Sequence, residues 1–208
     1  MDKFSFAVLI SGNGSNLQSM INAVEEGKIS GRICCVLSNK NQAYGLVRAK
    51  EADIPTEVVI NSDYDSREEF DKELVKVLSK YKPNLIVLAG FMRILSPVFI
   101  QAFSGKILNI HPSLLPKYPG LNTHKRVLES LDELHGVTVH FVDESLDGGP
   151  ICAQSSLKIN TSSVKELENQ IHEIEHEIYP KVIGWFAEGF LKLDKGKAFL
   201  HNKEVKIK

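Results

Sequence analysis

The sequence is poor in cysteine, and what cysteine it has is not arranged for disulfides. Its 208 residues include only three cysteines, Cys34, Cys35 and Cys152. An odd count with two adjacent members excludes a disulfide framework and favours a reducing, cytoplasmic setting. No turn or helix start follows the pair, as a reactive thiol would need, so we interpret all three as small apolar core residues.

The chain also has neither a large net charge nor a long hydrophobic run, and this excludes two classes of partner. The formal net charge is −1, so neither a nucleic acid nor an anionic membrane is an expected partner. The apolar run near the N-terminus is too short to span a membrane and lacks the cleavage site of a signal peptide. We therefore expect small-molecule substrates, and the sequence does not distinguish a monomer from a homodimer.

A glycine-rich segment lacks the marks of the two common nucleotide-binding loops. Residues 11–16 read Ser-Gly-Asn-Gly-Ser-Asn, with no Gly-Lys-Ser/Thr of a P-loop. Leu17 takes the third glycine position of the dinucleotide fingerprint, and Ser38 and Asn39 stand where its acidic residue would be. Backbone N–H groups at such a loop still attract anions. We expect a phosphate monoester here; the alternative is a tight turn with a helix cap.

Strand and helix signals alternate along most of the chain. Apolar runs predict strands at residues 4–11, 32–37, 56–60, 85–89, 106–111, 136–141 and 151–159. Amphipathic stretches predict helices at residues 16–26, 45–52, 66–80, 123–131 and 164–186, with a further helix starting at 96. This rhythm predicts an α/β protein with a Rossmann-like, open, mostly parallel twisted sheet and helices on both faces. We expect a single domain, 1–208, with a short hairpin-like tail after about residue 189.

Four connections in this predicted fold combine glycine or proline with polar side chains. In open α/β sheets, ligands bind beyond the carboxyl ends of the strands. We expect the four connections along that edge, at residues 12–16, 89–95, 111–124 and 143–150. Fold and composition therefore indicate one common site.

An amide, an imidazole and a carboxylate stand out in two of these connections. Asn109 and His111 are two residues apart at the end of a predicted strand, so both side chains point to the same side. Asp147 lies in a Leu-Asp-Gly-Gly-Pro turn from which a carboxylate can reach a neighbouring strand. An imidazole exchanges protons near neutrality, a carboxylate stabilises its charged form, and an amide N–H donates to an oxyanion. The trio predicts acid–base chemistry at a carbonyl carbon.

A nucleophile for covalent catalysis is missing beside this trio. No serine or cysteine occupies a strand-to-helix elbow, as an acyl-enzyme mechanism would require. We therefore predict direct transfer, in which an amine attacks the carbonyl while the protein handles charge and protons.

Other histidines offer competing interpretations. Residues 172–176 read His-Glu-Ile-Glu-His, which matches the zinc-protease pattern, but we recognise no third ligand and expect no metal. His124, His135 and His140 form an alternative acid–base set. His140 alternates with apolar residues and is expected to be structural, whereas His124 is expected to shape the site. Tyr118 and Pro119 are expected to set loop conformation.

Several long segments resemble the folate-dependent formyltransferases. The resemblance starts from Asn-Ile-His-Pro-Ser-Leu-Leu-Pro-Lys-Tyr-Pro-Gly at 109–120 and Val-His-Phe-Val-Asp-Glu-Ser-Leu-Asp-Gly-Gly-Pro at 139–150. Residues 11–16, 89–96 and 120–124 narrow it to the phosphoribosylglycinamide formyltransferases, the folate-dependent glycinamide ribonucleotide transformylase family. Such a resemblance implies a formyltransferase fold and transfer of the formyl group of 10-formyltetrahydrofolate to the amine of 5-phosphoribosyl-glycinamide, in de novo purine (IMP) biosynthesis.

The resemblance also implies a role for individual residues. By motif match, the catalytic positions are Asn109, His111 and Asp147. The positions for the acceptor substrate are Gly14, Ser15 and Asn16 at its phosphate and Glu175 near its ribose and glycinamide. The folate-binding positions are Arg67, Met92, Arg93, Ile94, Leu95, Val142, Glu144 and Leu146. 10-Formyltetrahydrofolate is the implied co-substrate, and no metal is implied.

Three alternatives stay open at this point. Methionyl-tRNA formyltransferases carry an additional C-terminal RNA-binding domain, whereas only about 20 residues follow Gly-Trp-Phe here, which disfavours tRNA. Formyltetrahydrofolate deformylases carry an additional N-terminal regulatory domain, whereas this chain begins at its first predicted strand. A non-enzymatic phosphate-binding module would keep residues 12–16 but would not need the Asn, His and Asp trio.

Overall fold

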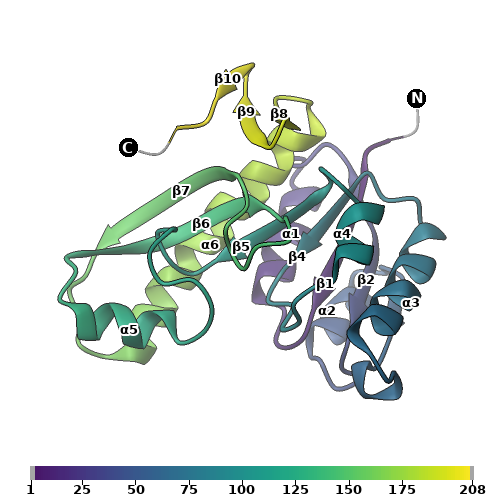
Figure 1. Ribbon diagram of the computed structural model, residues 1–208, viewed down its shortest axis with the longest axis horizontal. Coiled ribbons are helices and arrows are strands. Elements are labelled where there is room, and N and C mark those ends of the chain that lie inside the picture. Colours follow the sequence, from purple (N-terminus) through teal and green to yellow (C-terminus); the bar gives the residue numbers. More distant parts are fainter. Residues whose placement is uncertain (1–2, 207–208) are drawn as a thin grey trace.

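A seven-stranded sheet with helices on both faces forms the body of the protein (Figure 1). The computed structural model describes residues 3–206. The sheet strands are β1 (Ser5–Ile10), β2 (Arg32–Ser38), β3 (Thr56–Val58), β4 (Leu85–Leu88), β5 (Ile107–His111), β6 (Leu134–Phe141) and β7 (Ile151–Lys158). The helices are α1 (Ser15–Glu25), α2 (Gly45–Glu51), α3 (Arg67–Ser79), α4 (Pro97–Ala102), α5 (Thr123–Ser130) and α6 (Val164–Ala187), with a 3-10 turn at Asn61–Asp63.

The strand order confirms the predicted open, mostly parallel α/β sheet. The order is β3-β2-β1-β4-β5-β6-β7, with the first five strands parallel and β6 and β7 antiparallel. Most predicted elements match those observed within one or two residues. Helix α3 begins where its sequence predicts, because the Ser66 side chain accepts the backbone N–H of Glu69 at 3.2 Å.

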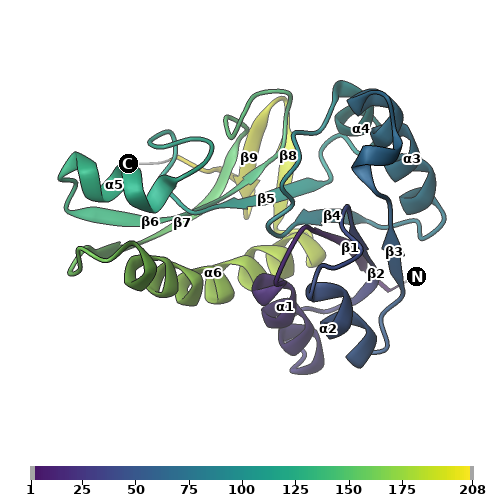
Figure 2. The same ribbon diagram turned by 90° about the horizontal axis from the view of Figure 1, so that it is seen from below.

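The central strand β1 is buried on both faces, as parallel strands under helices are. Its side chains alternate between the faces, so Phe6 and Val8 pack in the core under α1, α2 and α6. Ala7 and Leu9 pack in a second core under α3 and α4. Figure 2 shows these two helical layers on opposite sides of the sheet.

The connection predicted at residues 143–150, which the structure places between β6 and β7 at residues 142–150, does not leave the sheet where the sequence predicts. Because β6 runs antiparallel to β5, the 142–150 connection leaves the sheet beside the beginning of β5, where Val142 N–H donates to Ile107 O at 3.0 Å. The expectation that all four connections extend from carboxyl ends of parallel strands is therefore wrong for this one. It folds back along β5 instead, and this return brings Asp147 to His111.

A hydroxyl in the core joins α6 to the two strands that carry the site. Tyr179 is fully buried, and its hydroxyl lies 2.9 Å from Leu88 O and 3.0 Å from Leu108 O. Burial raises its pKa well above 10, so it remains a neutral donor. This contact fixes the end of β4 and the residue before Asn109 against α6.

The chain ends in a small antiparallel sheet of β8 (Leu191–Asp194), β9 (Lys197–Leu200) and β10 (Lys203–Glu204). Leu191 and Ala198 of this sheet are buried in the core that contains β1 and α6. No helix within residues 3–206 is long and apolar enough to cross a membrane.

Candidate active site

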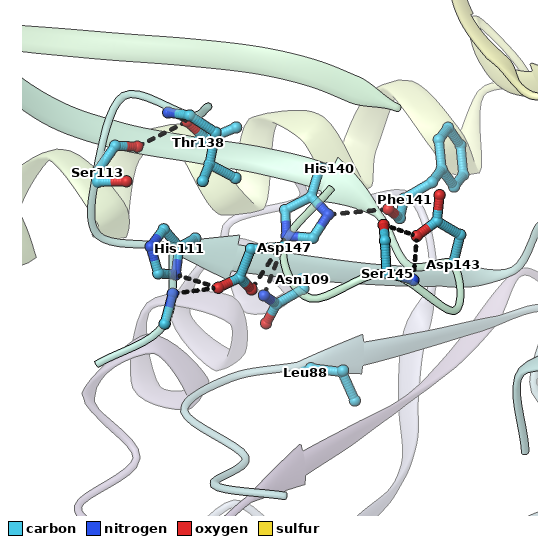
Figure 3. A network of polar contacts seen from close by, with 12 residues as sticks. Leu88, Asn109, His111, Ser113, Thr138, His140, Phe141, Asp143, Ser145 and Asp147 are labelled. Atoms are coloured by element: carbon cyan, nitrogen blue, oxygen red, sulfur yellow. Dashed lines mark hydrogen bonds and ion pairs between the residues drawn. The ribbon is translucent and has the colours of Figure 1, made fainter. Parts of the chain in front are cut away.

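Asn109, His111 and Asp147 meet at β5 (Figure 3). His111 Nδ1 lies 3.3 Å from Asp147 Oδ2, which also accepts the backbone N–H of Gly120 at 2.8 Å. Both side chains are largely buried. The structure thus joins the three residues that the sequence predicts to act together, from two separate segments of the chain.

Both ring nitrogens of His111 face oxygen atoms that only accept hydrogen bonds. Nδ1 faces the Asp147 carboxylate, and Nε2 lies 2.8 Å from the backbone oxygen of Tyr118. The imidazolium is the form that donates to both at once. The arrangement therefore suits a positively charged His111 beside a reaction centre that becomes negative.

His140 belongs to the same polar network. Its Nε2 lies 3.1 Å from the Asn109 amide nitrogen and 3.9 Å from Asp147 Oδ1, and its Nδ1 lies 2.9 Å from Phe141 O. Burial lowers the pKa of His140, although the Phe141 carbonyl and Asp147 act in the opposite direction. The sequence assigned His140 only a structural role because its neighbours are apolar. The sequence could not show that Asn109 and His140 are opposite each other on the antiparallel strands β5 and β6.

The segment after β5 is held against β6 by hydroxyl groups. Thr138 Oγ1 donates to Ser113 O at 2.7 Å and accepts the N–H of Leu115 at 3.0 Å. Tyr118 has a φ of 56° and its hydroxyl donates to Asp132 at 2.8 Å. These bonds fix the Tyr118 carbonyl at His111, in keeping with the predicted role of Tyr118 in loop conformation.

The glycine loop joins β1 to α1 and touches two other helices. Gly14 has a φ of 75°, and a Cβ on it would lie 2.7 Å from the Cα of Gly45, so a larger residue does not fit. Ser15 begins α1. Asn16 Nδ2 donates to Glu175 Oε2 of α6 at 2.8 Å, and both side chains are buried. Burial raises the pKa of Glu175, and the Asn16 hydrogen bond opposes this shift.

Arg48 of α2 adds a positive charge to the glycine loop. Its guanidinium donates to Asn13 O at 3.0 Å, to Asn13 Oδ1 at 3.2 Å and to Gln18 Oε1 at 3.1 Å. An open groove between α1 and α6 begins at Ser15 and Arg48 and continues past His176. Nothing in the sequence around Arg48 indicates this position, because it depends on how α2 packs beside α1.

The 89–96 connection lies next to the glycine loop. Ser11 Oγ accepts the N–H of Met92 at 2.8 Å and donates to Asn39 Oδ1 at 2.6 Å. Met92 and Ile94 are 60% and 59% exposed, which is unusual for apolar side chains in a connection so tightly held. Leu95 is instead buried in the core with α3 and α4.

Two arginines, one of them in this connection, lie near the same buried carboxyl. Arg67 and Arg93 both lie near Asp71, a buried carboxyl that accepts the N–H of Ser96. Burial raises the pKa of Asp71, and Ser96 and the two arginines oppose this shift. The Arg93 guanidinium also lies 5.9 Å from the centre of the Phe70 ring. Both positive charges are therefore close to Asp71, next to the end of this connection.

The 142–150 connection supplies further predicted folate residues. Val142 is half-buried against the core of α3 and α4, and Glu144 is exposed. Leu146 is exposed and lies next to Gly120. Leu121 is 73% exposed and follows Gly120 directly, so it joins the exposed apolar residues of this region without having been singled out from the sequence.

The remaining histidines lie outside this network. His124 Nδ1 and His135 Nε2 are 3.0 Å apart, and the rings of His172 and His176 are stacked with centroids separated by 6.2 Å. Within residues 3–206, no group of three or more His, Cys, Asp or Glu side chains is arranged to hold a metal ion.

His135 makes a testable contribution to acid stability. Burial lowers its pKa from 6.5 to about 4, so below pH 6.5 the unfolded chain takes up a proton that the folded chain does not. Stability is therefore lost as the pH falls from 6.5 towards 4. His135→Gln should remove about 2 kcal/mol of the loss between pH 7 and pH 5, measured by urea unfolding at both values. Equal losses in the two proteins would contradict this assignment.

Comparison with known proteins identifies relatives over nearly the whole chain. The formyl transferase family model matches residues 4–183. Phosphoribosylglycinamide formyltransferase of Escherichia coli is 50% identical over 202 residues, which are 97% of this chain and 95% of that protein. The human trifunctional purine biosynthetic protein adenosine-3 is 43% identical over 94% of this chain, which corresponds to 20% of that longer protein.

Comparison with solved structures identifies the same kind of protein as comparison of sequences. The phosphoribosylglycinamide formyltransferase of Coxiella burnetii superposes with a TM-score of 0.94 at 46% identity, covering 99% of this chain and 97% of that chain. Sequence and fold comparisons therefore agree, and the chain belongs to the formyl transferase family.

Proposed function

We propose that the protein transfers the formyl group of 10-formyltetrahydrofolate to the amine of 5-phosphoribosyl-glycinamide, a step of de novo purine (IMP) biosynthesis. The observation that carries the proposal is the contact of Asp147 with His111 beside Asn109, in a member of the formyl transferase family. Relatives that match nearly the full chain carry this activity in their names. We also propose that the chain forms one formyltransferase domain, because the C-terminal sheet shares the core of β1 and α6.

The amine of the acceptor attacks the formyl carbon and forms a tetrahedral intermediate with a negatively charged oxygen. Asn109 donates a hydrogen bond to this oxygen, and the positive charge of protonated His111 stabilises it. Tyr118 O and Asp147 hold the two ring nitrogens of His111, so the imidazolium acts here through its charge. The bond from carbon to folate N10 then breaks. The proton lost by the amine moves through Asp147 and water to N10.

The acceptor phosphate is assigned to Gly14, Ser15 and Asn16. The start of α1 offers backbone N–H groups there, and Arg48 contributes a positive charge from the neighbouring helix. Glu175, held by Asn16, is assigned to the ribose and glycinamide part of the same substrate. One chain of contacts thus links the phosphate end of the acceptor to α6.

The folate co-substrate is assigned to the region between the 89–96 and 142–150 connections. Exposed Met92, Ile94 and Leu146 offer apolar surface to the pterin and benzoyl rings, with Val142 beside them and Leu95 packed beneath. Arg67 and Arg93 offer cations to the glutamate carboxylates, and Glu144 lies at the exposed edge. The reaction needs no metal in this scheme.

One experiment tests the proposed function against its nearest alternative. Purified protein is incubated with 10-formyltetrahydrofolate, with and without 5-phosphoribosyl-glycinamide, and loss of the formyl group is followed together with formylated product. We expect formyl loss only when the amine acceptor is present. Equal loss without the acceptor would instead identify a deformylase, and no loss in either mixture would reject formyl transfer.

A further inference from the structure

His140 is buried beside Asn109, and both of its ring nitrogens are engaged. Nδ1 lies 2.9 Å from the carbonyl oxygen of Phe141, which only accepts hydrogen bonds, so Nδ1 must carry a hydrogen. In a neutral imidazole Nε2 is then an acceptor. At 3.1 Å it takes a hydrogen from the Asn109 amide nitrogen.

This bond decides which way the Asn109 amide faces. The two ends of an asparagine amide have nearly the same shape, but the nitrogen donates hydrogen bonds and the oxygen only accepts them. Figure 3 shows the amide nitrogen of Asn109 on the side of His140 and Asp147, with the amide oxygen turned away. One hydrogen of that nitrogen goes to His140, and the second remains for another acceptor. Asn109 is only half-buried, so a substrate oxygen has access to it.

We propose that His140 is a positioning residue for the transfer reaction: as a neutral acceptor, it holds the donor end of the Asn109 amide at the reacting carbonyl. This inference rests on the proposed formyl transfer, in which Asn109 donates to the oxyanion. A protonated His140 donates from both nitrogens, so it would bind the Asn109 oxygen instead and turn the amide over. The role of His140 is therefore exercised through Asn109 and not by contact with the substrate.

The surroundings keep His140 in its neutral form. Asp147 and Asp143 of the 142–150 connection favour its charged form, while His111 of β5 and burial oppose it. Burial is the largest of these effects, and it lowers the pKa of His140. The acceptor is thus present at neutral pH and is lost only when the pH falls through that lowered pKa.

Two substitutions separate the acceptor from the imidazole ring itself. His140→Ala removes the acceptor, and we expect kcat to fall about tenfold, part of the 10²–10³-fold typical for complete loss of an oxyanion donor, while both KM values stay within about twofold. His140→Gln restores an uncharged amide oxygen that can accept from Asn109, so it should recover most of kcat. It should also remove any loss of activity in acid that titration of His140 causes in the wild type. Wild-type kcat in His140→Ala would overturn the proposal.

A double-mutant cycle with Asn109 gives the strictest test. In an Asn109→Ala background there is no amide left to orient, so adding His140→Ala should cost less than about twofold in kcat. Losses that multiply would show that His140 acts independently of Asn109 and would overturn the proposal. If thermal unfolding shows that His140→Ala does not fold, His140→Leu, which keeps the volume but has no acceptor, takes its place in the cycle.

His135 provides a matched control on the same strand. It is a buried histidine of β6 whose ring contacts His124 and not Asn109. His135→Gln should leave kcat at neutral pH within about twofold of wild type, because substitutions outside a coupled network act independently of it. A loss equal to that of His140→Ala would indicate a general packing effect along β6 and would overturn the specific role.

The order of the measurements distinguishes failure of this inference from failure of the proposed function. The wild type is assayed first with both substrates. Absence of transfer there rejects the proposed function and the role of His140 with it. Transfer by the wild type combined with multiplicative losses in the cycle rejects the positioning role alone.

Discussion

Asp147→Asn should lower kcat by about 10³–10⁴-fold, comparable to the loss when the carboxylate of a serine-protease triad is replaced by an amide. The substitution removes the charge that faces His111 Nδ1 at 3.3 Å and leaves most other features in place. An asparagine oxygen still accepts the Gly120 N–H that Asp147 accepts at 2.8 Å. Asp147 has a φ of 52°, a backbone region that asparagine tolerates as well as aspartate does. The loss therefore reports the carboxylate charge and not the loop.

The measurement is steady-state formyl transfer together with its pH profile. If the charge of Asp147 serves mainly to stabilise imidazolium at His111, the alkaline limb of the profile, where activity is lost as His111 gives up its proton, should shift to lower pH in the variant. If Asp147 relays the proton, kcat should fall at every pH with little change in the shape of the profile. Unchanged turnover and an unchanged profile would exclude Asp147 from catalysis.

Asp143→Asn is the matched control for this prediction. Asp143 lies in the same 142–150 connection, is exposed, and accepts the N–H of Ser145 at 2.9 Å. Its replacement removes one negative charge from the same segment without touching His111. We expect kcat within about threefold of wild type, because exposed charges contribute little. A loss as large as that of Asp147→Asn would point to the net charge of the connection rather than to the contact with His111.

Asn109→Ala should lower kcat by about 10²–10³-fold, the range for removal of one oxyanion donor. Asn109 has its amide nitrogen 3.1 Å from His140 Nε2 and on the side of Asp147, where we propose that the tetrahedral oxygen forms. Hydrogen bonds to this oxygen strengthen in the transition state, so KM for either substrate should change by less than about threefold. Rapid-quench single-turnover assays would separate the chemical step from product release.

Asn109→Asp sharpens this prediction. Aspartate has nearly the same shape as asparagine but has no donor, and it places a second carboxylate beside Asp147. It should therefore be at least as damaging as alanine at neutral pH, since like charges repel. If Asn109→Asp kept more activity than Asn109→Ala, the amide would not be acting as a hydrogen-bond donor to the oxyanion.

Much of the fold could be predicted because its signals are local. Apolar runs and amphipathic stretches indicated the order of strands and helices, and Ser66 marked the start of α3. The tail beyond Gly189 gave weaker signals, and β10 pairs with β9 over only two residues. The antiparallel direction of β6 was also not predicted, because the pattern of apolar residues in a buried strand is the same in either direction.

The candidate site was predicted unevenly, according to how its residues lie along the chain. Asn109 and His111 share one strand, and Asp147 stands in a conspicuous Gly-Gly-Pro turn, so all three were visible. The contact of Arg48 with the glycine loop could not be predicted, because the Arg48 side chain reaches the loop from a different helix. His140 was assigned only a structural role in the core, because its contact with Asn109 depends on the pairing of β6 with the neighbouring strand β5.

The sequence by itself determined the class of fold, the glycine loop and the residue types of the candidate catalytic centre, because periodicity, turn chemistry and short spacings are properties of neighbouring residues. Tertiary structure alone decided that Asp147 returns along β5 to His111, that Glu175 contacts Asn16 and that His140 contacts Asn109. These contacts depend on strand register and on the packing of α6 across the sheet. Both arise from burial of apolar surface over the whole chain, which no local pattern specifies.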